Sequence, residues 1–143
     1  MWRNVVPIVE FVKLDKPEKA KHLCQLAAEF YHQGKRVLII VVDDNQALTL
    51  DRFMWTWDRH SFLPHVWDNG AVECHQEAIA IGTQQRNPNR AQVLIAASPC
   101  LAEFMCQFEH VVDFAETYDD ALRDAARKRY AQWQGVGCEL RMR

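Results

Sequence analysis

The most hydrophobic stretch of the chain runs from Lys35 to Val42, where six consecutive aliphatic residues follow two basic ones. A run without polar alternation is typical of a strand that is buried on both faces, as in a parallel sheet covered by helices. Gly34 just before it suits the end of a helix. Asp43 and Gln46 just after it form a capping-box pattern, which predicts a helix start. We therefore interpret this run as the central strand of an α/β sheet.

Elsewhere, short apolar runs alternate with segments of helical periodicity. The predicted strands are Val5–Val12, Lys35–Val42, Ala78–Ile81, Val93–Ala97 and His110–Phe114. The predicted helices begin at Asp15, Asp43, Ser98 and Tyr118 and end near Gly34, Trp57, Gln107 and Gly135. Segments 58–70 and 83–90 are predicted loops, and Pro7 suggests that the first strand lies at an edge or begins irregularly.

Strands and helices that alternate on short connections imply a mostly parallel sheet with helices on both faces. The sequence therefore predicts a three-layer α/β/α fold, Rossmann-like, with residues 1–143 forming a single domain.

The composition and charge of the chain exclude some classes of protein and disfavour others. The chain has 143 residues, 49% of them hydrophobic, and a net charge of -2, which excludes a disordered chain and disfavours a polyanion-binding surface over the whole molecule. It has no apolar run long enough to span a membrane and no signal peptide, so we expect a cytoplasmic protein without a membrane partner. The five cysteines are scattered through apolar segments, and we interpret them as reduced core residues.

The end of the Lys35–Val42 strand is the usual place for chemistry in an α/β protein. Here the turn is Asp43-Asp44-Asn45-Gln46, which lacks glycine and carries two negative charges, so it would repel a phosphate. Asp43 and Asp44 suit helix capping and a favourable charge in the first helical turn. The alternative is a small nucleotide- or phosphate-handling enzyme that uses these two carboxylates. No metal-binding or nucleophile motif is present, so no catalytic residue, metal ligand or cofactor is predicted.

Two groups of residues suit protein interfaces better than catalysis. Arg123, Arg127 and Tyr130 share one face of the last predicted helix, where two guanidinium groups beside an aromatic ring suit a carboxylate next to an apolar group. The alternative is a solvated basic face that complements the helix dipole.

The second group is aromatic, with three of the five tryptophans on the end of one helix and its following loop. Such clusters mark protein interfaces when they are exposed, or they cover one end of the core. The residues concerned are Trp55, Trp57, Phe62, Leu63, Pro64 and Trp67.

The order of several short motifs along almost the whole chain resembles the chi subunit of bacterial DNA polymerase III. The segments Ser61-Phe-Leu-Pro-His65 and Val111-Val-Asp-Phe114 carry most of the resemblance. The other matching pieces are Gly34-Lys-Arg-Val-Leu-Ile, Leu50-Asp51, Trp55, Val93-Leu-Ile, Tyr118-Asp-Asp and Arg127-Lys-Arg-Tyr130.

The resemblance implies an accessory subunit of the clamp loader without catalytic activity of its own. Its implied partners are the psi subunit and the acidic C-terminal tail of the single-stranded-DNA-binding protein, with only indirect contact to nucleic acid. Arg123, Arg127 and Tyr130 match the positions that bind this tail. Trp55 and Phe62 match those presented to psi or to an alternative helicase partner.

The chain departs from this family pattern in two places. Segment 115–117 carries Glu116 where the family often has apolar residues lining the tail pocket, and Glu116 would oppose an acidic peptide if it pointed inward. The stretch from Asp68 to Thr83 does not match in detail.

Overall fold

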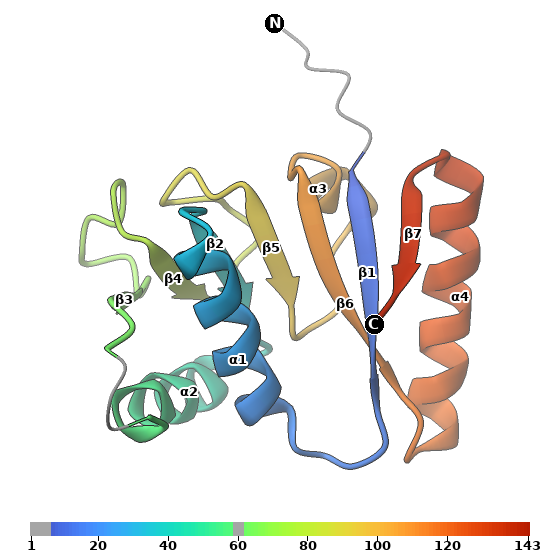
Figure 1. Cartoon of the computed structure of the whole chain (residues 1–143), viewed down its shortest axis with the longest axis horizontal. Helices are drawn as coiled ribbons and strands as arrows, with labels where there is room; N and C mark the ends of the chain where they lie inside the picture. The colour runs from blue at the N-terminus through green and yellow to red at the C-terminus, as the bar shows by residue number, and fades with distance from the viewer. Residues whose placement is uncertain (1–6, 59–61) are drawn as a thin grey trace, which may run out of the picture.

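One seven-stranded sheet organises the computed structural model, which describes residues 7–58 and 62–143 (Figure 1). All neighbouring strands are parallel, in the order β3-β4-β2-β5-β6-β1-β7. The strands are β1 (Ile8–Leu14), β2 (Val37–Ile40), β3 (His65–Trp67), β4 (Ile79–Gly82), β5 (Val93–Ala96), β6 (His110–Glu116) and β7 (Glu139–Met142). The helices are α1 (Lys19–His32), α2 (Asp44–Thr56), α3 (Ala102–Met105) and α4 (Asp120–Val136).

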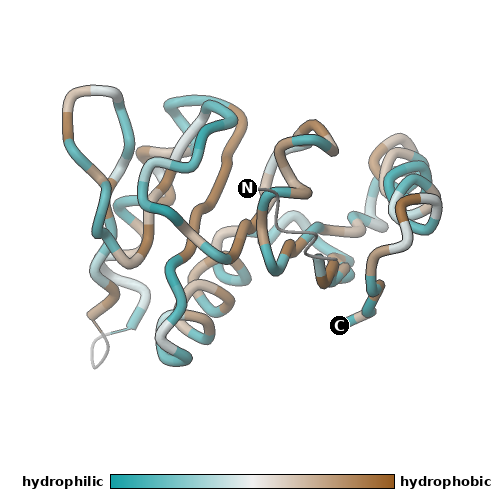
Figure 2. The backbone as a smooth tube through the Cα atoms, turned by 90° about the horizontal axis from the view of Figure 1, so that it is seen from above, coloured by the Kyte–Doolittle hydropathy of each residue, from teal (hydrophilic) through white to brown (hydrophobic). Residues whose placement is uncertain are grey.

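Successive residues of β2 show why the sheet has helices on both sides. Val37 and Ile39 join the core cluster formed with α1 and α2, whereas Leu38 and Ile40 join the cluster formed with α3 and α4. All four side chains are almost fully buried. In Figure 2 the helical turns alternate between hydrophobic and hydrophilic positions, as helices with one buried face do. The three-layer α/β/α prediction is thus confirmed, with a sheet that is entirely parallel.

The position of β2 differs slightly from the prediction. It lies inside the sheet between β4 and β5, but the middle strand is β5. Both strands are uninterrupted aliphatic runs, so hydrophobicity alone does not tell which is central. Of the two alternatives predicted from Pro7, an edge position and an irregular beginning, the edge position is wrong, because β1 pairs with β6 and β7. Pro7 precedes the strand, and the first backbone donor is the Ile8 amide, which reaches Glu109 O at 3.0 Å.

Helix α1 begins later than its capping pattern predicts. Its first residue is Lys19, and the N-cap position before it is Glu18, whose side chain makes no capping hydrogen bond. Asp15 instead accepts a hydrogen bond of 3.1 Å from the Thr117 hydroxyl, just beyond β6. A tertiary contact therefore takes the side chain that the local pattern assigns to the cap.

The helix predicted from Ser98 to Gln107 is also shorter, with a single turn in α3. Leu101 precedes it in extended conformation, its side chain is 66% exposed, and its amide is bound by the Gln85 side chain at 2.7 Å. The prediction that Ser98 caps this helix is therefore wrong.

Two strands, β3 and β7, were not predicted. Each is an edge strand with half-buried or exposed side chains, so neither carries the apolar run that marks a buried strand. Strand β7 matters for the site below, because it places Met142 beside β1. Within the described ranges, no helix is long and apolar enough to cross a membrane. All five cysteines are free, with Cys24 and Cys74 buried.

Candidate functional site

Helix α4 is fixed at both ends by local chemistry. The Asp119 side chain accepts a hydrogen bond of 3.0 Å from the Leu122 amide, and Asp120 adds a negative charge to the first turn. Gly137 ends the helix in the left-handed conformation with φ of 76°, which glycine adopts without strain. Ala126 and Trp133 are buried against the sheet, so the remaining faces of the helix are left for other contacts.

A pocket of about 330 Å³ opens between α4, β1, β7 and the end of β6, and we call it the arginine pocket. It brings together Arg123, Arg127 and Tyr130, the three residues predicted to share a face. The residues that line it are Phe11, Ala115, Glu116, Thr117, Arg123, Ala126, Arg127, Tyr130 and Met142.

Four of the residues that line the arginine pocket, Phe11, Ala126, Tyr130 and Met142, give it an apolar part. The ring of Tyr130 packs against that of Phe11 with centroids 5.3 Å apart. Ala126 adds a buried methyl group, and Met142 on β7 leaves 62% of its surface exposed. This part suits an aromatic or aliphatic side chain, because it removes apolar surface of both partners from water.

The two arginines hold only weak internal ion pairs. Arg123 pairs with Asp120, and Arg127 Nη1 lies 3.9 Å from Asp124 Oδ1, each pair being exposed and within one helix. Such pairs contribute little, since water screens them. Both guanidinium groups therefore retain N–H donors that suit a carboxylate.

Glu116 lines the same pocket, but its carboxylate is already bound. Lys19 Nζ lies 3.0 Å from Oε1, and the Tyr118 hydroxyl donates to Oε2 at 2.5 Å. Burial alone would raise the pKa of Glu116, but the hydrogen bonds from Tyr118 and Lys19 outweigh it and hold the pKa below its ordinary value. The carboxylate is therefore ionised at neutral pH, with its charge balanced by Lys19.

Arg129, the third arginine of α4, has a different environment. Its Nε donates to Asp113 Oδ2 at 2.8 Å, and its Nη2 donates to Phe114 O at 2.9 Å. Burial raises the pKa of Asp113, and the neighbouring Arg129 opposes that rise. Arg129 is therefore used to attach α4 to β6, and not to bind a ligand. A carboxylate within the apolar Val-Val-Asp-Phe strand is the sequence signal for this ion pair, because buried charges need partners.

The aromatic group divides into an exposed and a buried part. Trp55 and Phe62, which we call the aromatic patch, are 56% and 66% exposed, with ring centroids 5.5 Å apart. Trp57 and Trp67 pack against the core with α1 and α2, and Leu63 is part of that core. Part of the group therefore covers the core, as one alternative from the sequence predicts, and Trp55 and Phe62 are exposed.

His65 is a buried residue that packs against Trp55 of the aromatic patch. Its side chain is fully buried, with Nε2 3.0 Å from Asp51 Oδ1 on α2 and Nδ1 2.7 Å from Leu63 O. Its ring lies 4.8 Å from that of Trp55. The contact between Asp51 and His65 therefore joins the start of β3 to α2.

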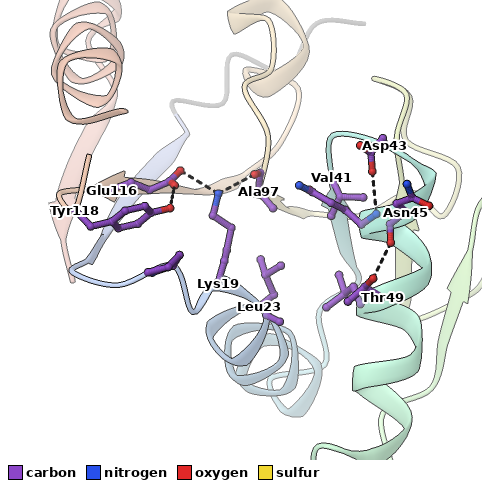
Figure 3. A pocket seen from close by; sticks show the side chains of 13 residues that line it. Lys19, Leu23, Val41, Asp43, Asn45, Thr49, Ala97, Glu116 and Tyr118 are labelled. Carbon is purple, nitrogen blue, oxygen red and sulfur yellow. Dashed lines mark hydrogen bonds and ion pairs between the residues drawn. The ribbon is translucent and has the colours of Figure 1, made fainter. Parts of the chain in front are cut away.

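Asp43 and Asp44 line separate cavities. Asp43 caps α2 by accepting a hydrogen bond of 2.9 Å from the Gln46 amide, which confirms the capping interpretation (Figure 3). It borders a cavity of about 440 Å³ that also contains Lys19 and Glu116. Asp44 borders a different polar cavity with Asp68, whose carboxylate is held by Arg86. The described part of the chain has no group of three His, Cys, Asp or Glu side chains that would hold a metal ion.

Comparison with known proteins identifies the family. The family model described as DNA polymerase III chi subunit, HolC, matches residues 7–141. The DNA polymerase III subunit chi of Escherichia coli (strain K12) is 35% identical over 118 residues, which cover 82% of this chain and 80% of that protein. The subunit of the same name from Haemophilus influenzae is 33% identical over 117 residues, or 82% of this chain and 81% of that protein. The chain therefore belongs to the DNA polymerase III chi subunit family.

Proposed function

We propose that this chi-family protein is a non-catalytic accessory subunit that links DNA polymerase III to the single-stranded-DNA-binding protein. In this role it binds psi on the clamp loader with one surface and the acidic C-terminal tail of the single-strand-binding protein with another. It touches DNA only through these partners, in keeping with a net charge of -2. Family membership supports the replication role, and two separate surfaces support the role of a connector.

The observation that carries the tail-binding proposal is the composition of the arginine pocket. Arg123 and Arg127 border a cavity whose apolar lining includes Phe11, Tyr130 and Met142. A peptide that ends in an aromatic residue offers a side chain and a free carboxylate at one position. The pocket complements both, because guanidinium groups bind carboxylates with paired hydrogen bonds and the rings accept the side chain.

The aromatic patch is the proposed site for psi or for an alternative helicase partner. Exposed large aromatic side chains that are held rigidly are preferred anchors in protein interfaces. The contacts of His65 with Asp51 and Trp55 provide this rigidity. The patch belongs to the α1/α2 side of the sheet, whereas the arginine pocket lies beside α4. Two partners are therefore expected to bind without competing for the same residues.

Calorimetric titration with an acidic peptide that ends in Phe tests the tail-binding proposal. We expect a dissociation constant in the micromolar range, which corresponds to a binding free energy of about -8 kcal/mol. The affinity should fall as salt is added, because the contact is charged. Arg127→Ala should weaken binding about tenfold, by removal of a charge-assisted hydrogen bond. A peptide with an amidated C-terminus should lose a similar factor.

The matched control is Arg52→Ala, which removes the same charge from the exposed surface of α2, away from the pocket. It should leave the affinity within about twofold of the parent protein, since distant exposed charges are screened. Absence of binding at low salt, or an Arg127→Ala variant that binds as tightly as the parent, contradicts the assignment of this pocket.

A further inference from the structure

Glu116 is an unexpected residue in a pocket for an acidic ligand. Among the described residues that line the arginine pocket, it is the one with a negative charge. It ends β6, so the strand fixes its backbone beside Ala115 and Thr117, which also line the pocket. The contacts of the Glu116 carboxylate therefore affect how strongly the pocket attracts an acidic peptide.

The carboxylate has donors on both oxygens, and Lys19 is the charged one. Figure 3 shows Lys19 reaching from α1 toward Glu116 and Ala97, and the Tyr118 hydroxyl bonded to the other oxygen of the same carboxylate. The Lys19 ammonium also donates to Ala97 O at 3.0 Å and lies 5.4 Å from the centroid of the Phe114 ring. Lys19 is therefore held by three contacts, and it lines the neighbouring cavity, not the arginine pocket.

We propose that Lys19 is a positioning residue of the arginine pocket, because it holds the Glu116 carboxylate toward the neighbouring cavity and balances its charge. This inference rests on the proposed function of that pocket. Without Lys19, the Glu116 carboxylate is free to turn toward Arg123 and Arg127. It then repels an acidic peptide or occupies the donors that the peptide needs. A lysine on α1 thus sets the affinity of a site beside α4.

A double-mutant cycle with the Phe-ending acidic peptide tests this role. Lys19→Met should weaken binding about fivefold, which is the effect of one unbalanced charge in a partly screened site. In the Glu116→Gln variant, the further change Lys19→Met should alter the affinity by less than about twofold. Such non-additivity is expected only if the two side chains act together.

Lys21→Met is the matched control, because it removes the same charge from the exposed face of α1. It should change the affinity by less than about twofold. An equal effect of Lys19→Met and Lys21→Met, or the same loss from Lys19→Met in both Glu116 and Gln backgrounds, overturns the proposal. Failure of the parent protein to bind the peptide contradicts the proposed function instead.

A measurement on the protein without peptide tests the role of Lys19 independently of peptide binding. The Glu116 carboxyl is followed by nuclear magnetic resonance during an acid titration of the parent protein and of the Lys19→Met variant. We expect it to titrate below its ordinary value of 4.5 in the parent and at a higher pH in the variant. Titration of the parent Glu116 at or above the ordinary value overturns the proposal, even if the variant does not fold.

Discussion

Arg127 and Arg129 are two residues apart on α4 and point to different parts of the molecule. The Arg127 side chain is 74% exposed at the arginine pocket, whereas that of Arg129 is 19% exposed and binds Asp113. A helix rotates its side chains by about 100° per residue, so neighbouring arginines in one basic segment acquire unrelated roles. Charge along the sequence shows that the segment is basic, but not which arginine meets a ligand.

Arg129→Ala should destabilise the fold, whereas Arg127→Ala should not. Loss of Arg129 leaves the Asp113 carboxylate buried without its cation, which costs about 3 kcal/mol of unfolding free energy. Loss of the exposed Arg127 should cost less than about 0.5 kcal/mol. Urea unfolding at neutral pH measures both. Equal stability of the two variants would mean that the Asp113–Arg129 pair does not hold α4 to β6.

Tyr130→Ala should weaken peptide binding in a different way from Arg127→Ala. The tyrosine contributes apolar contact, so its loss should reduce affinity about tenfold without changing the dependence on salt. Arg127→Ala should reduce both affinity and salt dependence. Titrations at three salt concentrations distinguish the two effects. If Tyr130→Ala flattens the salt dependence as much as Arg127→Ala does, the division into an apolar and a charged part is wrong.

At the scale of elements, the Lys19–Glu116 pair connects α1 to the end of β6 and should make stability depend on pH. The pKa of Glu116 is lower in the folded protein than its ordinary value of 4.5. A carboxyl group of this kind stabilises the fold above its unfolded pKa, and the contribution disappears as the pH falls through the folded pKa. Glu116→Gln should therefore lower the unfolding free energy at pH 7 and have no effect at a pH below both values.

Chemical unfolding of the parent and the Glu116→Gln variant over this pH range checks the prediction. Glu103→Gln is a control on α3, because Glu103 is exposed and not part of this pair. A difference between parent and Glu116→Gln that stays constant down to low pH would show that shape, not charge, explains the effect.

The sequence predicts the elements whose hydrophobic pattern is strong and misses those that depend on tertiary contacts. The aliphatic runs of β2 and β5 identify buried strands, and the spacing of Arg123, Arg127 and Tyr130 places them on one helix face. Strand β7 has no such pattern, because it is exposed at an edge and gains its stability from pairing with β1. Phe11 and Met142 could not be assigned to the site for this reason, since topology alone brings them to α4.

At the scale of the whole molecule, the sheet separates the two candidate surfaces. The aromatic patch is formed at the end of α2 and in the segment before β3, and α2 packs on the same side as α1. The arginine pocket lies beside α4, between β1, β7 and the end of β6. One continuous parallel sheet joins the elements that carry the two surfaces, which suits the proposed role of connecting two partners.

Binding at the two surfaces should therefore be independent. Phe62→Ala should weaken binding of psi or the helicase partner about tenfold, by removal of an exposed anchor, and leave the affinity for the acidic peptide within about twofold. Arg127→Ala should do the reverse.

Titration of the peptide into the protein alone and into its complex with the partner measures any coupling. We expect the two dissociation constants to agree within about twofold, because the surfaces share no residue and no coupling free energy is expected between sites without a common two-state element. A tenfold difference would mean that the sheet transmits a change from one surface to the other, and that the protein regulates its partners as well as joining them.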